Sequence, residues 1–244
     1  MPIHSRQRSN KTATPAENEP TNQQTVTHAG KVLLNSFHPL CSTPYGRAAI
    51  ERYGFRPYID GSIRREPDLE AEYPSITALC RLWKFAPRLF PGDKAVYLTV
   101  KRKYEGHDDK RQMLVAILEV IHRFDNHIQA ASWYEKKKLR LPSNCMVLGN
   151  PPMQFDQSSQ NAPPEYKNSP DEVRHEKWDA AYADRAAQCS VFLVCKPIFV
   201  ELDDPPVFTS QDMIDIFDHE PGTQNPPQIT EAEYMSLKAR AGIY

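Results

Sequence analysis

The sequence lacks the features that mark a membrane-spanning or secreted protein. Its 244 residues contain no run of about 18 apolar residues, the length that a membrane-spanning helix needs. The opening residues, MPIHSRQRSN, are followed by polar residues where a signal peptide requires an apolar stretch. We therefore expect a soluble, cytoplasmic protein with no membrane partner.

Signatures of the common cofactor and metal enzymes are also lacking. The sequence has no Walker loop, no GxGxxG, HExxH or GxSxG motif, and no zinc deaminase pattern of HxE with PCxxC. Its five cysteines form no CxxC pair and its histidines show no metal-binding spacing, while an odd cysteine count fits a reducing compartment. These absences disfavour P-loop hydrolysis, dinucleotide redox chemistry and zinc catalysis, so we expect no metal and no cofactor.

Glycine is scarce, with 9 residues, whereas 22 prolines predict many stiff, irregular loops. Hydrophobic residues make up 40% of the chain and charged residues 25%, which are values typical of globular proteins. Residues 1–30 are rich in Asn, Gln, Thr, Ser and Pro, and this composition predicts a disordered tail. We expect residues 31–244 to form a single domain, with a core at 31–202 and an acidic helical extension at 203–244.

Charge is divided unevenly along the chain, although its net charge is only −1. Residues 1–150 carry a net charge of +8, and residues 151–244 carry −9. A basic half indicates an anionic partner such as nucleic acid. The alternative is that both halves present solvated charged faces, with the acidic part packed beside the basic part.

The order of the expected elements indicates an α+β protein. Apolar and β-branched runs predict strands at residues 31–37, 94–100, 113–121 and 190–202, with the second and third paired as a hairpin. Helices are expected at residues 47–53, 75–82 and 125–138, and after the N-caps Ser169, Thr209 and Thr230. This order predicts a small curved mixed sheet or partial barrel flanked by helices.

The densest polar stretch lies at residues 58–73, YIDGSIRREPDLEAEY. Its one proline, its one glycine and the prolines that flank it disfavour a plain helix, so it predicts a solvated loop or a lining of paired charges. Carboxylates beside guanidinium groups can hold a base edge, neutralise phosphate or activate water. The candidate catalytic carboxylates, if the protein is an enzyme, are Asp60, Glu66 and Asp68.

Other residues are candidates for contacts with nucleic acid. Asn144 and Asn150 flank a short apolar run and could read base edges, although Asn before Pro also forms turns. Tyr97 and Trp133 could stack on bases, although aromatics at such positions also build cores. The candidate anion or base contacts are Arg64, Arg65, Arg81 and Arg88.

Two stretches resemble known families. Residues 90–99, FPGDKAVYLT, with the aliphatic strand at 113–121, resemble the PUA-like superfamily of EVE, YTH and ASCH domains. Residues 60–88, with RREPDLEAEYPSITALCR and FAPRL, look like prokaryotic domains of unknown activity that are associated with nucleotide modification and phage conflict. The resemblance implies a pocket in a small barrel that accepts a base turned out of the nucleic-acid stack.

Three functions follow as hypotheses. The leading one is a nucleic-acid-binding protein, with DNA favoured over RNA, that recognises a modified base in bacterial defence or DNA modification. The alternative is a DNA glycosylase that removes such a base and uses one carboxylate to activate water or to stabilise the oxocarbenium-like sugar. A third is a protein-interaction module or antitoxin, in which the proline-rich loops and opposite charges dock a protein partner.

Overall fold

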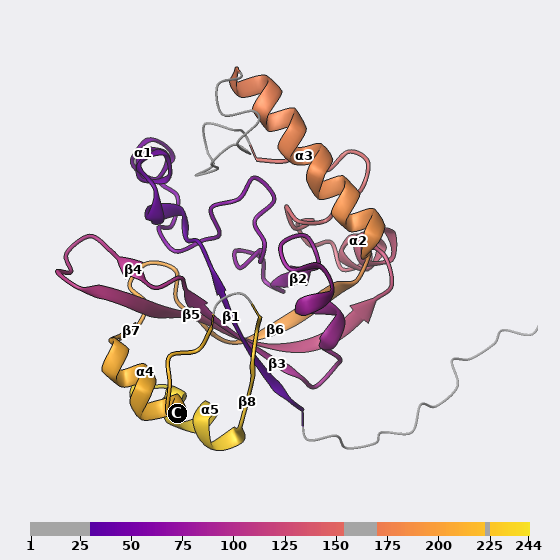
Figure 1. Ribbon diagram of the computed structural model, residues 1–244. Coiled ribbons are helices and arrows are strands. Elements are labelled where there is room, and N and C mark those ends of the chain that lie inside the picture. The colour runs from indigo at the N-terminus through magenta and orange to yellow at the C-terminus, as the bar shows by residue number, and fades with distance from the viewer. Residues whose placement is uncertain (1–29, 154–169, 223–224) are drawn as a thin grey trace, which may run out of the picture.

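The computed structural model describes residues 30–153, 170–222 and 225–244 (Figure 1). The predicted tail at residues 1–30, apart from Gly30, and the proposed N-cap Ser169 lie outside the described residues. The strands are β1 (Val32–Phe37), β2 (Ser75–Thr77), β3 (Lys94–Thr99), β4 (Arg102–Lys103), β5 (Lys110–Phe124), β6 (Phe192–Val200), β7 (Val207–Phe208) and β8 (Gln228–Ile229). The helices are α1 (Pro44–Tyr53), α2 (His127–Lys136), α3 (Asp171–Gln188), α4 (Ser210–Phe217) and α5 (Glu231–Arg240), with short 3-10 turns at Leu40–Ser42, Leu82–Lys84 and Ala86–Arg88.

The strands of the described residues form one open, mixed sheet of eight strands. Its order is β2-β6-β5-β3-β1-β8, and β4 and β7 also pair with β5. Only β1 and β3 run parallel among these pairs; the other pairs are antiparallel. The α+β prediction is confirmed, and so is the predicted pairing of β3 with β5.

The two faces of the sheet carry separate cores because side chains alternate along each strand. On one face, Leu33 and Phe37 of β1 join Tyr97 of β3 and the loops before β3. On the other face, Leu34 and Val96 pack against α4 and α5, which lie together on one side of the sheet in Figure 1. Residues 203–244 therefore cover one face of the sheet and also add β7 and β8 to it.

Local sequence signals placed several helix starts correctly. Thr209 and Thr230 each form a capping box, with Asp212 and Glu233 respectively. Helix α1 begins at Pro44 with Thr43 as its N-cap, three residues before the expected start. Helix α2 is capped by Asn126 and not by Asp125, because the side-chain Oδ1 of Asn126 accepts a hydrogen bond from the Gln129 N–H.

The helix predicted at residues 75–82 is wrong. Residues Ser75–Thr77 form strand β2, which pairs antiparallel with β6 at residues 192–194. All three residues are buried, so long-range pairing outweighs a helix-start signal that rested on Ser75 after Pro74. Strand β2 begins at Ser75, opposite Val194, so no residue of β2 pairs with Pro197 of β6. On the other side of β6, the register with β5 shifts next to Pro197.

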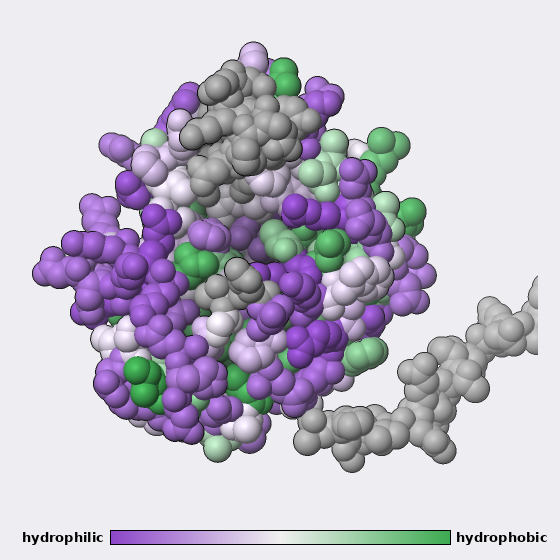
Figure 2. Space-filling view, viewed as in Figure 1, coloured by the Kyte–Doolittle hydropathy of each residue, from purple (hydrophilic) through white to green (hydrophobic). Residues whose placement is uncertain are grey.

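The surface in the view of Figure 2 is mostly hydrophilic, with apolar side chains in small, separate patches. No helix among the described residues has both the length and the apolar character required to cross a membrane.

Candidate functional site

Residues 59–69 of the charged stretch are buried, although the stretch has the composition of a surface loop, and only its end, with Glu70 and Glu72, is exposed. Asp60, Arg64, Arg65, Glu66 and Asp68 are each at most 5% exposed. Buried charges must be paired or hydrogen-bonded, since their desolvation is otherwise costly. The stretch is therefore a lining of paired charges, and the solvated-loop alternative is wrong.

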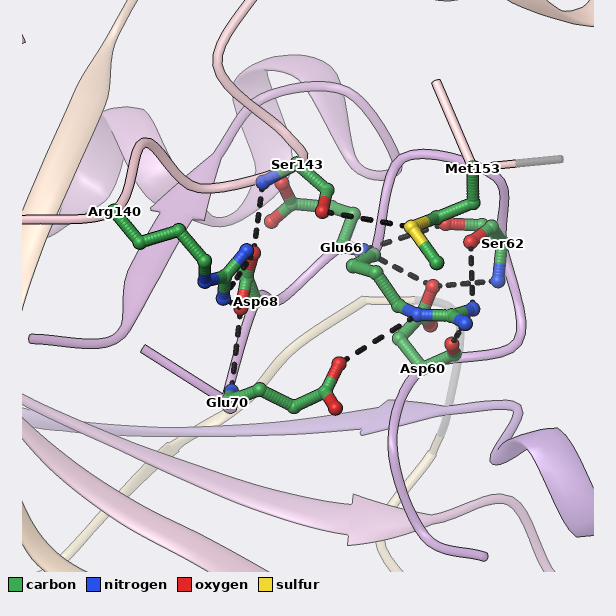
Figure 3. A network of polar contacts seen from close by, with 9 residues as sticks. Asp60, Ser62, Glu66, Asp68, Glu70, Arg140, Ser143 and Met153 are labelled. Carbon is green, nitrogen blue, oxygen red and sulfur yellow. Dashed lines mark hydrogen bonds and ion pairs between the residues drawn. The ribbon is translucent and has the colours of Figure 1, made fainter. Parts of the chain in front are cut away.

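Asp68 joins this stretch to the loop that follows α2 (Figure 3). Its carboxylate accepts hydrogen bonds from Arg140 Nη2 at 3.0 and 3.2 Å, from the Ser143 N–H at 2.8 Å and from the Glu70 N–H at 3.2 Å. Asp68 is fully buried and does not line the cavity described below. These bonds give Asp68 a structural role in the fold, and its catalytic role stays a prediction.

Arg64 and Arg65 are also used inside the fold. Arg64 forms a two-pronged ion pair with Asp179 of α3, at 2.6 and 2.9 Å, and donates to the carbonyls of Ser143 and Asn150. Arg65 donates through Nη1 to the carbonyls of Asp60 and Ser62 and is only 1% exposed, while its Nε and Nη2 have no hydrogen-bond partner among the described residues. Both arginines are buried inside the fold, and their contact with an external anion or base stays a prediction.

A cavity of about 400 Å³ lies beside the carboxyl end of β1, on the face of the sheet opposite α4 and α5. This volume is within the range of about 300–1,000 Å³ found for small-molecule sites. Four segments surround the cavity: the end of β1, the 60–66 loop, the segment from β2 to Phe85, and helix α3. The lining residues that carry the argument are Asn35, Asp60, Glu66, Arg81, Trp178 and Tyr182.

Glu66 is positioned in this cavity by several donors. Its Oε1 accepts from the Thr77 N–H at 2.9 Å, and its Oε2 accepts from Thr77 Oγ1 at 2.5 Å and from Asn144 Nδ2 at 3.0 Å. Asn144 is itself held by Ser75, whose hydroxyl donates to its Oδ1. Because Oε2 already accepts two bonds, Oε1 is the oxygen with capacity left for a proton or a ligand.

Asp60 lies next to Glu66 and has a different environment. Its Oδ1 accepts hydrogen bonds from the Ser62 N–H at 2.8 Å and from the Glu66 N–H at 3.0 Å. Burial raises the pKa of Asp60 to about 6, and burial together with the nearby Asp60 charge raises the pKa of Glu66 to about 8. At neutral pH the cavity therefore holds one mostly ionised and one mostly protonated carboxyl group.

Aromatic rings form the walls of the cavity. Trp178 and Tyr182 of α3 stack on each other, with ring centroids 5.9 Å apart and an angle of 23° between planes. Phe37 and Phe85 line another part of the cavity, and both make T-shaped contacts with the Tyr97 ring. Apolar walls with a few convergent polar groups are typical of a site for a planar organic ligand.

Positively charged side chains lie near His38, which lines the cavity. Burial and the charges of Arg102 and Arg81 lower the pKa of His38. Arg81 lines the cavity and is fixed by a hydrogen bond from Nη2 to the Ser36 carbonyl, at 3.0 Å. Arg185 of α3 donates to the Leu79 carbonyl and lies over the Tyr182 ring. An anionic group at the mouth would meet a positive potential.

Cys80 also lines the cavity and must be considered as a nucleophile. The residue is exposed, yet loss of hydration at its thiol and the charges of Asp60 and Glu66 raise its pKa well above the usual range. Since the thiolate is the reactive form, this environment does not activate Cys80.

The remaining predicted site residues lie in several places. Tyr97 is buried behind the cavity, where its ring makes T-shaped contacts with Phe37 and Phe85, so it does not present a ring face to the surface or to the cavity. Trp133 packs on Tyr73, His122 and Tyr134 in a separate cluster. Asn150 donates to the carbonyls of Pro142 and Cys145, which is the turn role, and Arg88 donates to the carbonyls of Lys84 and Pro226.

The structure thus brings three of the predicted site residues, Asp60, Glu66 and Arg81, into one cavity, with Asn144 behind Glu66. The sequence did not identify Asn35, Trp178 and Tyr182 as site residues. Asn35 carries a signal, because it is an amide inside the apolar strand VLLNSF. Trp178 and Tyr182 carry none, because their spacing on α3 equally fits a helix face that packs on the core.

Comparisons of the chain with protein-family models, curated proteins and solved structures find no match. Within residues 30–153, 170–222 and 225–244, no group of three or more His, Cys, Asp or Glu side chains is arranged to hold a metal ion.

Proposed function

We propose that the cavity beside β1 binds a nucleobase that has turned out of a nucleic acid, with DNA as the favoured partner. The observation that carries this proposal is the combination of aromatic walls, formed by Phe85, Trp178 and Tyr182, with the polar groups of Asn35 and Glu66 in one cavity of about 400 Å³. Proteins that accept an extruded base stack it between aromatic or apolar side chains and hydrogen-bond its edge. The resemblance of residues 60–88 to nucleotide-modification domains supports a role in bacterial defence or DNA modification as part of this proposal.

The charges at the mouth support a partner that brings phosphate. A base enters such a cavity together with its sugar, so the flanking phosphates remain at the rim. Arg81 and Arg102 lie near His38 at that rim, and positively charged side chains there stabilise phosphate contacts. Helices α4 and α5, which belong to the acidic segment 203–244, cover the opposite face of the sheet and so lie away from the phosphates.

Replacement of one wall of the cavity tests this proposal. We expect Trp178→Ala to weaken binding of an oligonucleotide that contains one mismatched base by about 5- to 100-fold, because stacking on an aromatic side chain contributes about 1–3 kcal/mol per base. The measurement is fluorescence anisotropy with a labelled oligonucleotide. Trp133→Ala is the matched control, since Trp133 is also a half-buried tryptophan but packs in another cluster. Equal losses in both variants would count against the cavity as the binding site.

A second function, hydrolysis of the N-glycosidic bond, is favoured by the two carboxyl groups. Enzymes provide an acid and a base at one pH by giving two neighbouring carboxyl groups different surroundings and therefore different pKa values. Ionised Asp60 would accept a proton from water as the water oxygen bonds to the sugar C1′ and the bond to the base breaks. Protonated Glu66 would donate its proton to the departing base.

The Asp60→Asn variant separates binding from hydrolysis. Asn keeps an oxygen that can accept from the Ser62 and Glu66 N–H groups, so the loop should hold its shape. For an enzyme, we expect release of free base to fall by a factor of about 100 or more while oligonucleotide affinity is retained. Mass spectrometry of released bases, with an assay for abasic sites, gives the result. If neither the wild type nor the variant releases base although both bind, the protein is a reader.

A further inference from the structure

The region behind the cavity contains hydrogen-bonding capacity that the protein does not use. The Tyr97 side chain is 1% exposed, and its hydroxyl has no hydrogen-bond partner among the described residues. The Trp178 Nε1–H on the cavity wall is likewise buried without a partner. Buried polar groups in folded proteins are nearly always paired, so an orphaned group beside a cavity points to a ligand atom that pairs with it.

The Tyr97 hydroxyl lies near two polar residues that line the cavity. Asn35 is the register partner of Tyr97 across the β1–β3 pair and approaches the hydroxyl without hydrogen-bond geometry. The Asn35 Oδ1 accepts from the Ser36 N–H, which leaves its amide N–H groups for another partner. Burial and the charge of Glu66 raise the pKa of Tyr97 well above its usual range, so its hydroxyl remains protonated.

Three groups from separate segments thus lie close together on one side of the cavity: Asn35 and Glu66 line it, and Tyr97 lies directly behind Asn35. Tyr97 comes from β3, Asn35 from β1, and Glu66, with capacity left on Oε1, from the charged loop. If the ring of a base lies between the aromatic walls, these three groups are placed to contact a substituent of that ring. An apolar substituent such as methyl would leave these groups unpaired, and that is costly in a buried site.

We infer that the base recognised by this cavity carries a short polar substituent, such as a hydroxymethyl group, which hydrogen-bonds with the Tyr97 hydroxyl, the Asn35 amide and Glu66. This inference rests on the proposed function and adds the chemical class of the ligand. Discrimination against the unmodified base and the methylated base then comes from unpaired buried groups, a stronger basis for selectivity than the size of a methyl group.

The test compares oligonucleotides that are identical except for one extrudable base, which is hydroxymethylcytosine, methylcytosine or cytosine. We expect the full-length wild-type protein to bind the hydroxymethyl form about tenfold more tightly than the methyl form, the effect of one net hydrogen bond. Tyr97→Phe removes only the hydroxyl and should bring this ratio close to one. Tyr104→Phe is the control, since it also removes a buried hydroxyl, one that donates to the Val100 carbonyl outside the cavity.

Each outcome leads to a distinct conclusion. A wild-type preference that Tyr97→Phe abolishes and Tyr104→Phe retains supports the inference. Equal wild-type affinity for the hydroxymethyl and methyl forms overturns the inference. A preference for the hydroxymethyl form that survives in Tyr97→Phe also overturns it. Both outcomes leave the base-binding proposal intact. If the wild type binds none of the three oligonucleotides more tightly than a fully paired duplex, the proposed function fails, and the inference fails with it.

Discussion

Arg64→Ala is expected to lower the free energy of unfolding by about 3–5 kcal/mol, the range for breaking a buried ion pair by removing one partner. Arg64 is 4% exposed and holds three segments together: Asp179 of α3, and the carbonyls of Ser143 and Asn150. Alanine leaves all of these acceptors without their donor. Because α3 carries Trp178 and Tyr182, loss of this ion pair should also loosen one wall of the cavity.

Arg56→Ala is the matched control for this prediction. Arg56 also forms a two-pronged pair with an aspartate, Asp203, but the two side chains are 47% and 59% exposed. Solvent screening limits such a pair to about 0–1 kcal/mol. Urea denaturation of both variants and the wild type gives the comparison. Similar losses in the two variants would show that burial of Arg64 does not determine its contribution to stability.

The second large effect is a pH dependence of stability that originates at Glu66. Its pKa in the folded protein, about 8, lies above the ordinary value of 4.5 that applies to the unfolded chain. The stability that the protonated group contributes is therefore fully present below about pH 4.5 and is lost as the pH rises through about 8. Between about pH 5 and about pH 8 the loss amounts to about 3 kcal/mol, since each pKa unit corresponds to about 1.36 kcal/mol.

Glu66→Gln isolates this contribution because glutamine does not titrate. The substitution also changes the stability of the protein at every pH, because the NH₂ group of glutamine must face one of the donors that bond to the carboxyl group of Glu66. The informative quantity is therefore the difference in unfolding free energy between the two pH values, measured by urea denaturation for each protein. We expect the wild type to lose about 3 kcal/mol more than Glu66→Gln over this interval. Glu51→Gln, at an exposed position on α1, should behave as the wild type does.

Equal pH dependence in the wild type and Glu66→Gln would mean that Glu66 is already ionised near neutral pH. It could then serve neither as the acid of a glycosylase nor as a hydrogen-bond donor to a bound base. The stability measurement therefore bears on the chemistry of the cavity without requiring knowledge of the ligand.

The sequence by itself determined the elements whose signals are local. The capping boxes at Thr209 and Thr230 need only residues three apart, so the starts of α4 and α5 could be predicted. The apolar runs of β1, β3, β5 and β6 are long enough to predict strands at any position in the fold. Together these signals fixed the α+β class, and the density of charge at residues 58–73 directed attention to the segment that supplies Asp60 and Glu66.

Only the tertiary structure decided which of those charged residues face a cavity. Asp60, Glu66 and Asp68 lie within nine residues of one another, yet Asp68 is held by Arg140 and Ser143 while Glu66 is held in the cavity by Thr77 and Asn144. These partners lie 11 to 78 residues away along the chain, so no local pattern contains them. The same reason applies to Trp178, Tyr182 and Tyr97, because a helix or strand pattern shows that a side chain is buried but not whether a cavity lies beside it.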